Sequence, residues 1–172
     1  MGTDIHLRVQ GKTAEGWEYV KTQPFPKYGD AGFSFDEGPC VRDYRVFALL
    51  AGVRNGTGFA GIRTHKPVDP AFAGRGLPDG VTEDDGPAPD PDSDEDPFFL
   101  AGSNSIGDHS FTHATLAELR AVRWDTPFVY PDGTSTLEDC EFRAWLTSPA
   151  MLAIEAKYGG ADNVRVIIGF DS

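Results

Sequence analysis

The stretch TDIHLRVQ, residues 3–10, decides the fold that the sequence predicts. Apolar residues stand at every second position, at Ile5, Leu7 and Val9, with polar residues between them. Successive side chains of a strand point to opposite faces, so this alternation predicts a strand with one face on the core. The closing stretch, residues 163–170, alternates in the same way. We expect these two most apolar strands to be neighbours in an antiparallel sheet.

Working outward, residues 16–20 (GWEYV) predict a second strand, which forms a hairpin with the first. Residues 42–53 predict a helix, because Val46, Leu49, Leu50 and Val53 form the stripe of a core-facing helix. Residues 55 to about 110 show no sustained periodicity.

The second half of the chain predicts short helices and one further strand. Thr115 and Glu118 have the spacing of a capping box, and a short helix is expected after them. A short strand is predicted at 127–130 and a helix at 137–146, capped by Ser135 or Thr136. Another helix is expected to start at Ser148 and Pro149 and to stop at Gly159.

These elements together predict a single α+β domain over residues 1–172. Its small antiparallel sheet combines the N-terminal hairpin with the C-terminal strand. Helices are expected on the face that holds the apolar residues of the first strand. A long irregular insertion separates the two halves.

Nine acidic residues and no Lys or Arg lie in the Pro-rich segment 79–97. The formal charge of the chain is −12, and removing those nine charges leaves −3 for the rest. We expect about 80–97 to be disordered, either as a solubilising insertion or as a tail that engages a host protein as a DNA mimic would. This acidity argues against a protein that coats DNA. It leaves room for a local basic pocket.

The sequence also indicates where in the cell the protein is expected. No apolar run approaches the roughly 20 residues of a membrane span, and the N-terminus lacks the pattern of a signal peptide. Cys40 and Cys140 are too few for a disulfide scaffold or a Cys-based zinc site. We therefore expect a cytoplasmic protein without a membrane partner.

Two short motifs contain side chains that could bind a metal ion or act as an acid or base. Asp4 and His6 lie two residues apart on a strand, so both side chains leave the same face and could share a metal or form a base with its orienting acid. Within GDHSFTH, residues 107–113, the candidates are Asp108, His109 and His113. In a helix, His109 and His113 would share a face at a spacing that suits zinc. The Asp-His-Ser run resembles part of a hydrolase triad, but adjacent residues rarely point at one another, so we do not expect a triad.

A third set is basic and could grip phosphate, because guanidinium groups bind phosphate in a bidentate manner. Surface solvation is the alternative interpretation. The set consists of Arg42, Arg45, Arg54, Arg63 and Arg75. The chain contains no P-loop, dinucleotide-binding glycine motif, H-E-x-x-H motif or G-x-S-x-G elbow.

Five blocks in order along the chain resemble a family of small phage and prophage proteins that usually carry no assigned function. The opening MGTDIH resembles its M-G-x-D-I-H start, and residues 42–54 resemble its R-N-Y-x-x-F-x-x-L-A-G-V-R segment. Residues 74–79, the D-H-S run before T-L-x-E-L, and the terminal strand resemble its other blocks. Thr3 and Asp43 stand where the family commonly has Cys and Asn. The resemblance implies a phage origin and the cytoplasm of an infected bacterial host.

Three functions follow as expectations. The leading one is a phage accessory protein that binds a small anionic, nucleotide-like ligand and sequesters a host signal. Phosphates would be held by Arg42, Arg45, Arg54 and Arg75, with hydrogen bonds from His6 and His109. No cofactor is then required, and a homo-oligomer remains open.

The second expectation is a metal-dependent hydrolase of a phosphoester or nucleotide. Asp4, His6 and His109 would hold zinc or manganese, with Asp108 or His113 as further ligands. The third is an inhibitor that binds a host protein through the acidic insertion.

Overall fold

A computed structural model describes residues 3–21, 23–25, 42–84 and 106–171. Within them a four-stranded antiparallel sheet has the order β2-β1-β6-β3. The strands are β1 (Ile5–Thr13), β2 (Gly16–Tyr19), β3 (His109–Thr115) and β6 (Val164–Phe170). The predicted pairing of the first and last strands is confirmed, with Ile5 opposite Phe170 and Val9 opposite Val166.

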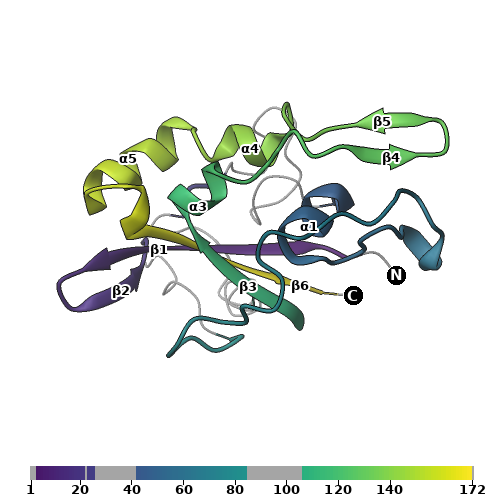
Figure 1. Cartoon of the computed structure of the whole chain (residues 1–172). Helices are drawn as coiled ribbons and strands as arrows, with labels where there is room; N and C mark the ends of the chain where they lie inside the picture. The colour runs from purple at the N-terminus through teal and green to yellow at the C-terminus, as the bar shows by residue number, and fades with distance from the viewer. Residues whose placement is uncertain (1–2, 22, 26–41, 85–105, 172) are drawn as a thin grey trace, which may run out of the picture.

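The helices lie on one face of this sheet, as predicted (Figure 1). They are α1 (Tyr44–Ala51), α3 (Leu116–Arg120), α4 (Glu141–Trp145) and α5 (Pro149–Tyr158). A separate hairpin of β4 (Phe128–Tyr130) and β5 (Gly133–Ser135) lies above α1 in the view of Figure 1. Two 3₁₀ turns are described, η1 (Phe59–Gly61) and η2 (Ala161–Asn163).

The core forms where the apolar face of the sheet meets the helices. Ile5, Leu7 and Val9 are fully buried there, together with Phe47 of α1 and Phe170 of β6. The rings of Phe47 and Phe170 meet edge to face with centroids 5.1 Å apart, an arrangement that aromatic pairs favour. The opposite face of the sheet therefore carries the intervening side chains of each strand.

The predicted helix boundaries hold where capping residues set them. Thr115 and Glu118 form the expected capping box, and Ser148 caps α5, which ends at Gly159. The predicted start of the helix at 137 is wrong. Ser135 belongs to β5, and α4 begins at Glu141, with the Cys140 sulfur accepting from the Arg143 amide.

Residues 107–113 do not form a loop or a helix over most of their length. They enter β3 at His109, because the open edge of β6 supplies hydrogen-bond partners for their backbone. The Thr112 hydroxyl is fully buried and donates to the Phe72 carbonyl at 2.6 Å. Most of the acidic segment 79–97 lies outside the described residues.

Candidate functional site

The first cluster of polar side chains lies where β1 starts and β6 ends, and we call it the sheet-end cluster: Asp4, His6, Arg42, His109 and Asp171. The Asp171 carboxylate accepts from the Asp4 amide at 2.9 Å and lies 3.1 Å from His6 Nε2. Asp171 was not among the predicted site residues. Its position one residue beyond the last strand, opposite Asp4, is what brings it to His6.

Two of the predicted arginines reach this end of the sheet. Arg42 Nε donates to Asp4 at 2.5 Å, and this hydrogen bond raises the pKa of Arg42. Arg54 donates to the Thr3 hydroxyl at 3.0 Å and lies over the Tyr44 ring. The structure therefore brings together the first strand and the segments on both sides of α1.

His109 joins the cluster from β3. It is paired with Phe170, the residue before Asp171, and its ring stacks on the Phe170 ring at a centroid distance of 6.3 Å. Burial raises the pKa of Asp171, but the hydrogen bonds from the Asp4 amide and His6, with a smaller electrostatic contribution from His109, lower it below its ordinary value. Asp108 Oδ1 lies 3.8 Å from His109 Nε2.

The remaining predicted residues lie elsewhere. Arg45 pairs with Asp43 at 2.7 Å and reaches Ser135, and Arg63 is exposed. His109 and His113 do not share a helix face, since both belong to β3. Within the described ranges, no three His, Cys, Asp or Glu side chains are grouped closely enough to hold a metal ion. The predicted zinc or manganese site over Asp4, His6, His109 and His113 is not assembled by these residues.

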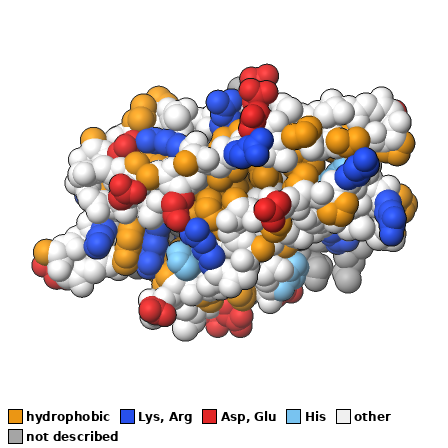
Figure 2. Space-filling model, viewed as in Figure 1, with side chains coloured by type: hydrophobic (Ala, Val, Ile, Leu, Met, Phe, Trp, Pro, Cys, Tyr) orange, Lys and Arg blue, Asp and Glu red, His pale blue; other side chains and the backbone are white. Residues whose placement is uncertain are grey.

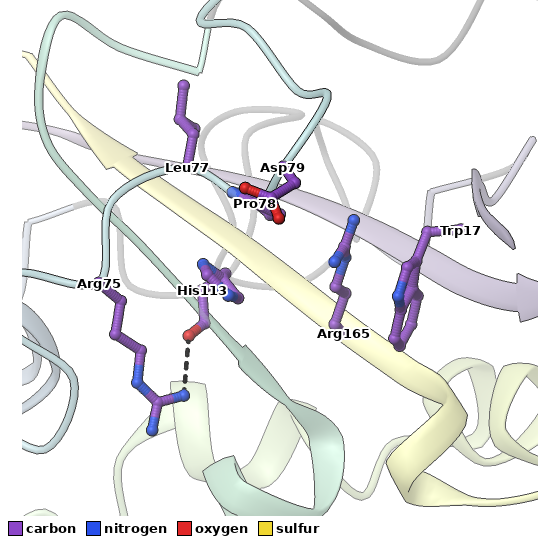
Figure 3. A pocket seen from close by; sticks show the side chains of 7 residues that line it. All are labelled: Trp17, Arg75, Leu77, Pro78, Asp79, His113 and Arg165. Atoms are coloured by element: carbon purple, nitrogen blue, oxygen red, sulfur yellow. Dashed lines mark hydrogen bonds between the residues drawn. The ribbon is translucent and has the colours of Figure 1, made fainter.

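A second cluster lines a cavity of about 380 Å³ on the sheet face opposite the helices (Figure 3), and we call it the groove. Trp17 of β2, His113 of β3 and Arg165 of β6 form its floor. Segment 75–79 passes over them and forms the wall.

Arg165 is the central side chain of the groove. Its guanidinium lies 4.3 Å from the centroid of the Trp17 ring, and its Nε donates to Gln10 at 2.7 Å. Burial lowers the pKa of Arg165. Across the described residues, no carboxylate forms an ion pair with this arginine.

Arg75 and His113 hold the wall against the sheet. Both terminal nitrogens of Arg75 bond to the Glu118 carboxylate, at 3.0 and 3.1 Å, and one also donates to the His113 carbonyl. His113 Nδ1 lies 3.0 Å from the Gly76 carbonyl, so Nδ1 carries the proton of that bond. The fork of Arg75 is occupied, which leaves Arg165 as the available cation among the described residues that line the groove.

Sequence reasoning missed Trp17 and Arg165 as site residues. Each occupies a polar-face position of an amphipathic strand, where alternation alone explains a polar or aromatic side chain. Figure 2 shows side chains of both signs interspersed over the visible face, so no single-sign patch marks a site there.

No protein-family model, curated protein or solved structure matches the chain. None of the helices in the described part of the chain has the length and hydrophobicity that crossing a bilayer requires.

Proposed function

We propose that this protein binds a small anionic, nucleotide-like ligand in the groove over Trp17, His113 and Arg165. The observation that carries the proposal is Arg165, a partly buried guanidinium that lines a cavity and has no acidic partner among the residues described.

The electrostatics of Arg165 favour an anion. Arginine stays protonated at any pH at which proteins fold, so burial leaves the charge in place and only makes it costly. The Nε of Arg165 already donates to Gln10. The terminal N–H groups of Arg165 remain as donors from which a phosphate or carboxylate could accept a pair of hydrogen bonds. The Trp17 ring fixes the plane of the guanidinium by stacking.

The rest of the lining sets the shape and polarity of the ligand. A cavity of about 380 Å³ lies at the lower end of the range for small-molecule sites. Leu77 and Pro78 supply apolar wall, whereas Asp79 adds a carboxylate that would reject a second anionic group and accept from an N–H donor. A single phosphate attached to a nitrogen-rich ring meets these requirements.

The proposal keeps the leading expectation from the sequence, in which the protein sequesters a host signal. Sequestration needs complementary charge and shape, and it requires no catalytic group. In this assignment the ligand is held by Arg165, and Arg75 shapes the wall.

A thermal-shift titration tests the proposal. Mono-, di- and cyclic nucleotides are added to the protein, and ligand at about 100 times its Kd should stabilise the fold by about 2.7 kcal/mol. Arg165→Gln should abolish the shift, because it retains a polar side chain without the charge. Arg123→Gln removes an exposed arginine outside the groove and should leave it unchanged. A flat response to the whole panel would overturn the proposal.

A further inference from the structure

Ser110 is held in an unusual backbone conformation next to a histidine. It is exposed on β3, and its φ of 54° lies in the left-handed region, which serine rarely adopts. Its Oγ lies 2.9 Å from Nδ1 of His109. The expectation that adjacent residues of the Asp-His-Ser run would not point at one another is therefore wrong for this pair.

The local backbone explains how neighbouring side chains come to face each other. The register of β3 against β6 shifts between His109 and Thr112, so Ser110 lies in a β-bulge. Gly107, just before, packs so closely that an added Cβ would lie 2.5 Å from the Phe170 carbonyl oxygen. The strand is thus fixed on both sides of the Asp-His-Ser run, and strained residues held this way are concentrated at functional sites.

An acidic group lies near the other nitrogen of the His109 ring. Asp108 Oδ1 is 3.8 Å from Nε2. Stacking on Phe170 fixes the ring plane. The hydroxyl and the imidazole therefore lie within hydrogen-bond distance, as a serine nucleophile and its general base require, whereas the Asp108 carboxylate is beyond hydrogen-bond distance of the ring.

We propose that Ser110 is a nucleophile that attacks carboxylic esters, with His109 as its general base. The Ser110 Oγ–H proton moves to His109 Nδ1 as Oγ forms a bond to the ester carbonyl carbon. The carbon–oxygen bond to the alcohol then breaks, and the alcohol leaves with the proton from His109. Water, deprotonated by His109, attacks the acyl-serine, releases the carboxylic acid and restores Ser110.

The charges around Ser110 favour an ester over a phosphoester. Of the carboxylates at this end of the sheet, Asp4 is paired with Arg42 and Asp171 with His6, which leaves the exposed Asp108 carboxylate beside His109. A dianionic phosphate would be repelled, whereas a neutral ester would not. This activity is separate from ligand binding in the groove, and neither proposal depends on the other.

Covalent labelling tests the nucleophile. The full chain is incubated with a fluorophosphonate probe, and the modified residue is mapped by mass spectrometry. Hydrolysis of p-nitrophenyl acetate is followed in parallel. We expect the probe on Ser110, with hydrolysis at least about 100-fold above that of Ser110→Ala. Modification of a different serine, or of none, would overturn the proposal.

Two further variants separate the reaction from the fold. Ser110→Gly should lose labelling while its melting temperature rises by about 2–4 °C, because glycine adopts this φ without strain. His109→Gln should slow labelling by about 100-fold or more with Ser110 still present. Ser135→Ala is the matched control, since that hydroxyl accepts from Arg45 and should not affect either readout. Unchanged labelling in His109→Gln would remove the general base from the proposal.

Discussion

Asp171 Oδ2 lies 3.1 Å from His6 Nε2, so an acid that follows the last strand holds a histidine of the first strand. Burial alone would raise the pKa of Asp171. The hydrogen bonds from the Asp4 amide and His6, with electrostatic contributions from His6 and His109, lower it further than burial raises it, and the net pKa falls below the ordinary value.

Because of the Asp171–His6 pair, the free energy of unfolding should depend on pH. A carboxyl whose pKa is lowered by folding stabilises the protein above its unfolded pKa of about 3.9, and the contribution is lost as the pH falls through the folded pKa. Asp171→Asn should therefore be less stable than the wild type near pH 7, with the difference shrinking below about pH 4. Urea midpoints from about pH 7 to pH 3 measure this, with Asp132→Asn, an exposed turn residue, as the control. A gap that is constant across the pH range would contradict the assignment.

Gly169 of β6 is expected to be difficult to replace. A Cβ built there would lie 1.7 Å from the Ile106 carbonyl oxygen, a backbone atom that cannot rotate away. Gly169→Ala should cost about 3 kcal/mol in the free energy of unfolding, at the upper end of overpacking effects. Gly133→Ala has open space and should change stability by less than about 0.5 kcal/mol. Chemical denaturation of the two variants decides the comparison, and equal midpoints would refute it.

The capping box at Thr115 links α3 to the segment that walls the groove. The Thr115 hydroxyl accepts from the Glu118 amide at 3.1 Å, and the Glu118 carboxylate bonds both the Thr115 amide and Arg75. Thr115→Ala should lower the free energy of unfolding by about 1 kcal/mol. Thr147→Ala, where an exposed hydroxyl donates only to a helix carbonyl, should have a smaller effect in the same urea titration. The reverse order would contradict the capping role.

Arg165 should contribute little to stability despite its burial. Its charge has no acid partner in the described chain, so Arg165→Gln should change the free energy of unfolding by less than about 1 kcal/mol. Arg120 is the comparison, because it pairs with Glu155 at 2.8 Å and donates to the Leu146 carbonyl. Arg120→Gln should cost about 1.5 kcal/mol or more. If Arg165→Gln proves the more damaging of the two in urea, Arg165 is a structural residue.

The sequence predicted the elements whose cause is local. Alternation marked β1 and β6, and capping residues at Thr115 and Ser148 marked the starts of α3 and α5. It missed β3 because that strand buries a polar residue, Thr112, whose hydroxyl is satisfied by a carbonyl 40 residues away. A contact at such separation leaves no periodic pattern.

The same distinction between local and long-range causes applies to the residues of the candidate sites. Asp4 and His6 were predicted to leave one face of the first strand, and the predictable pairing of β1 with β6 brings Asp171 to His6. The contact of Arg42 with Asp4 depends instead on the position of Arg42 just before α1, which no local pattern encodes. Arg165 was not identified, since its importance comes from a wall, segment 75–79, whose path over the sheet no local pattern encodes. The facing of Ser110 and His109 depends on a bulge in β3, and bulges depend on the partner strand.

The register of β1 against β6 also bears on how the protein is made. Ile5 pairs with Phe170, so the ribosome must synthesise nearly the whole chain before the sheet can close. Until then, the nascent β1–β2 hairpin presents its apolar face and an unpaired edge to the surrounding solution. Closure over so long a separation is slow, and we expect chaperones to bind the emerging N-terminal hairpin during translation.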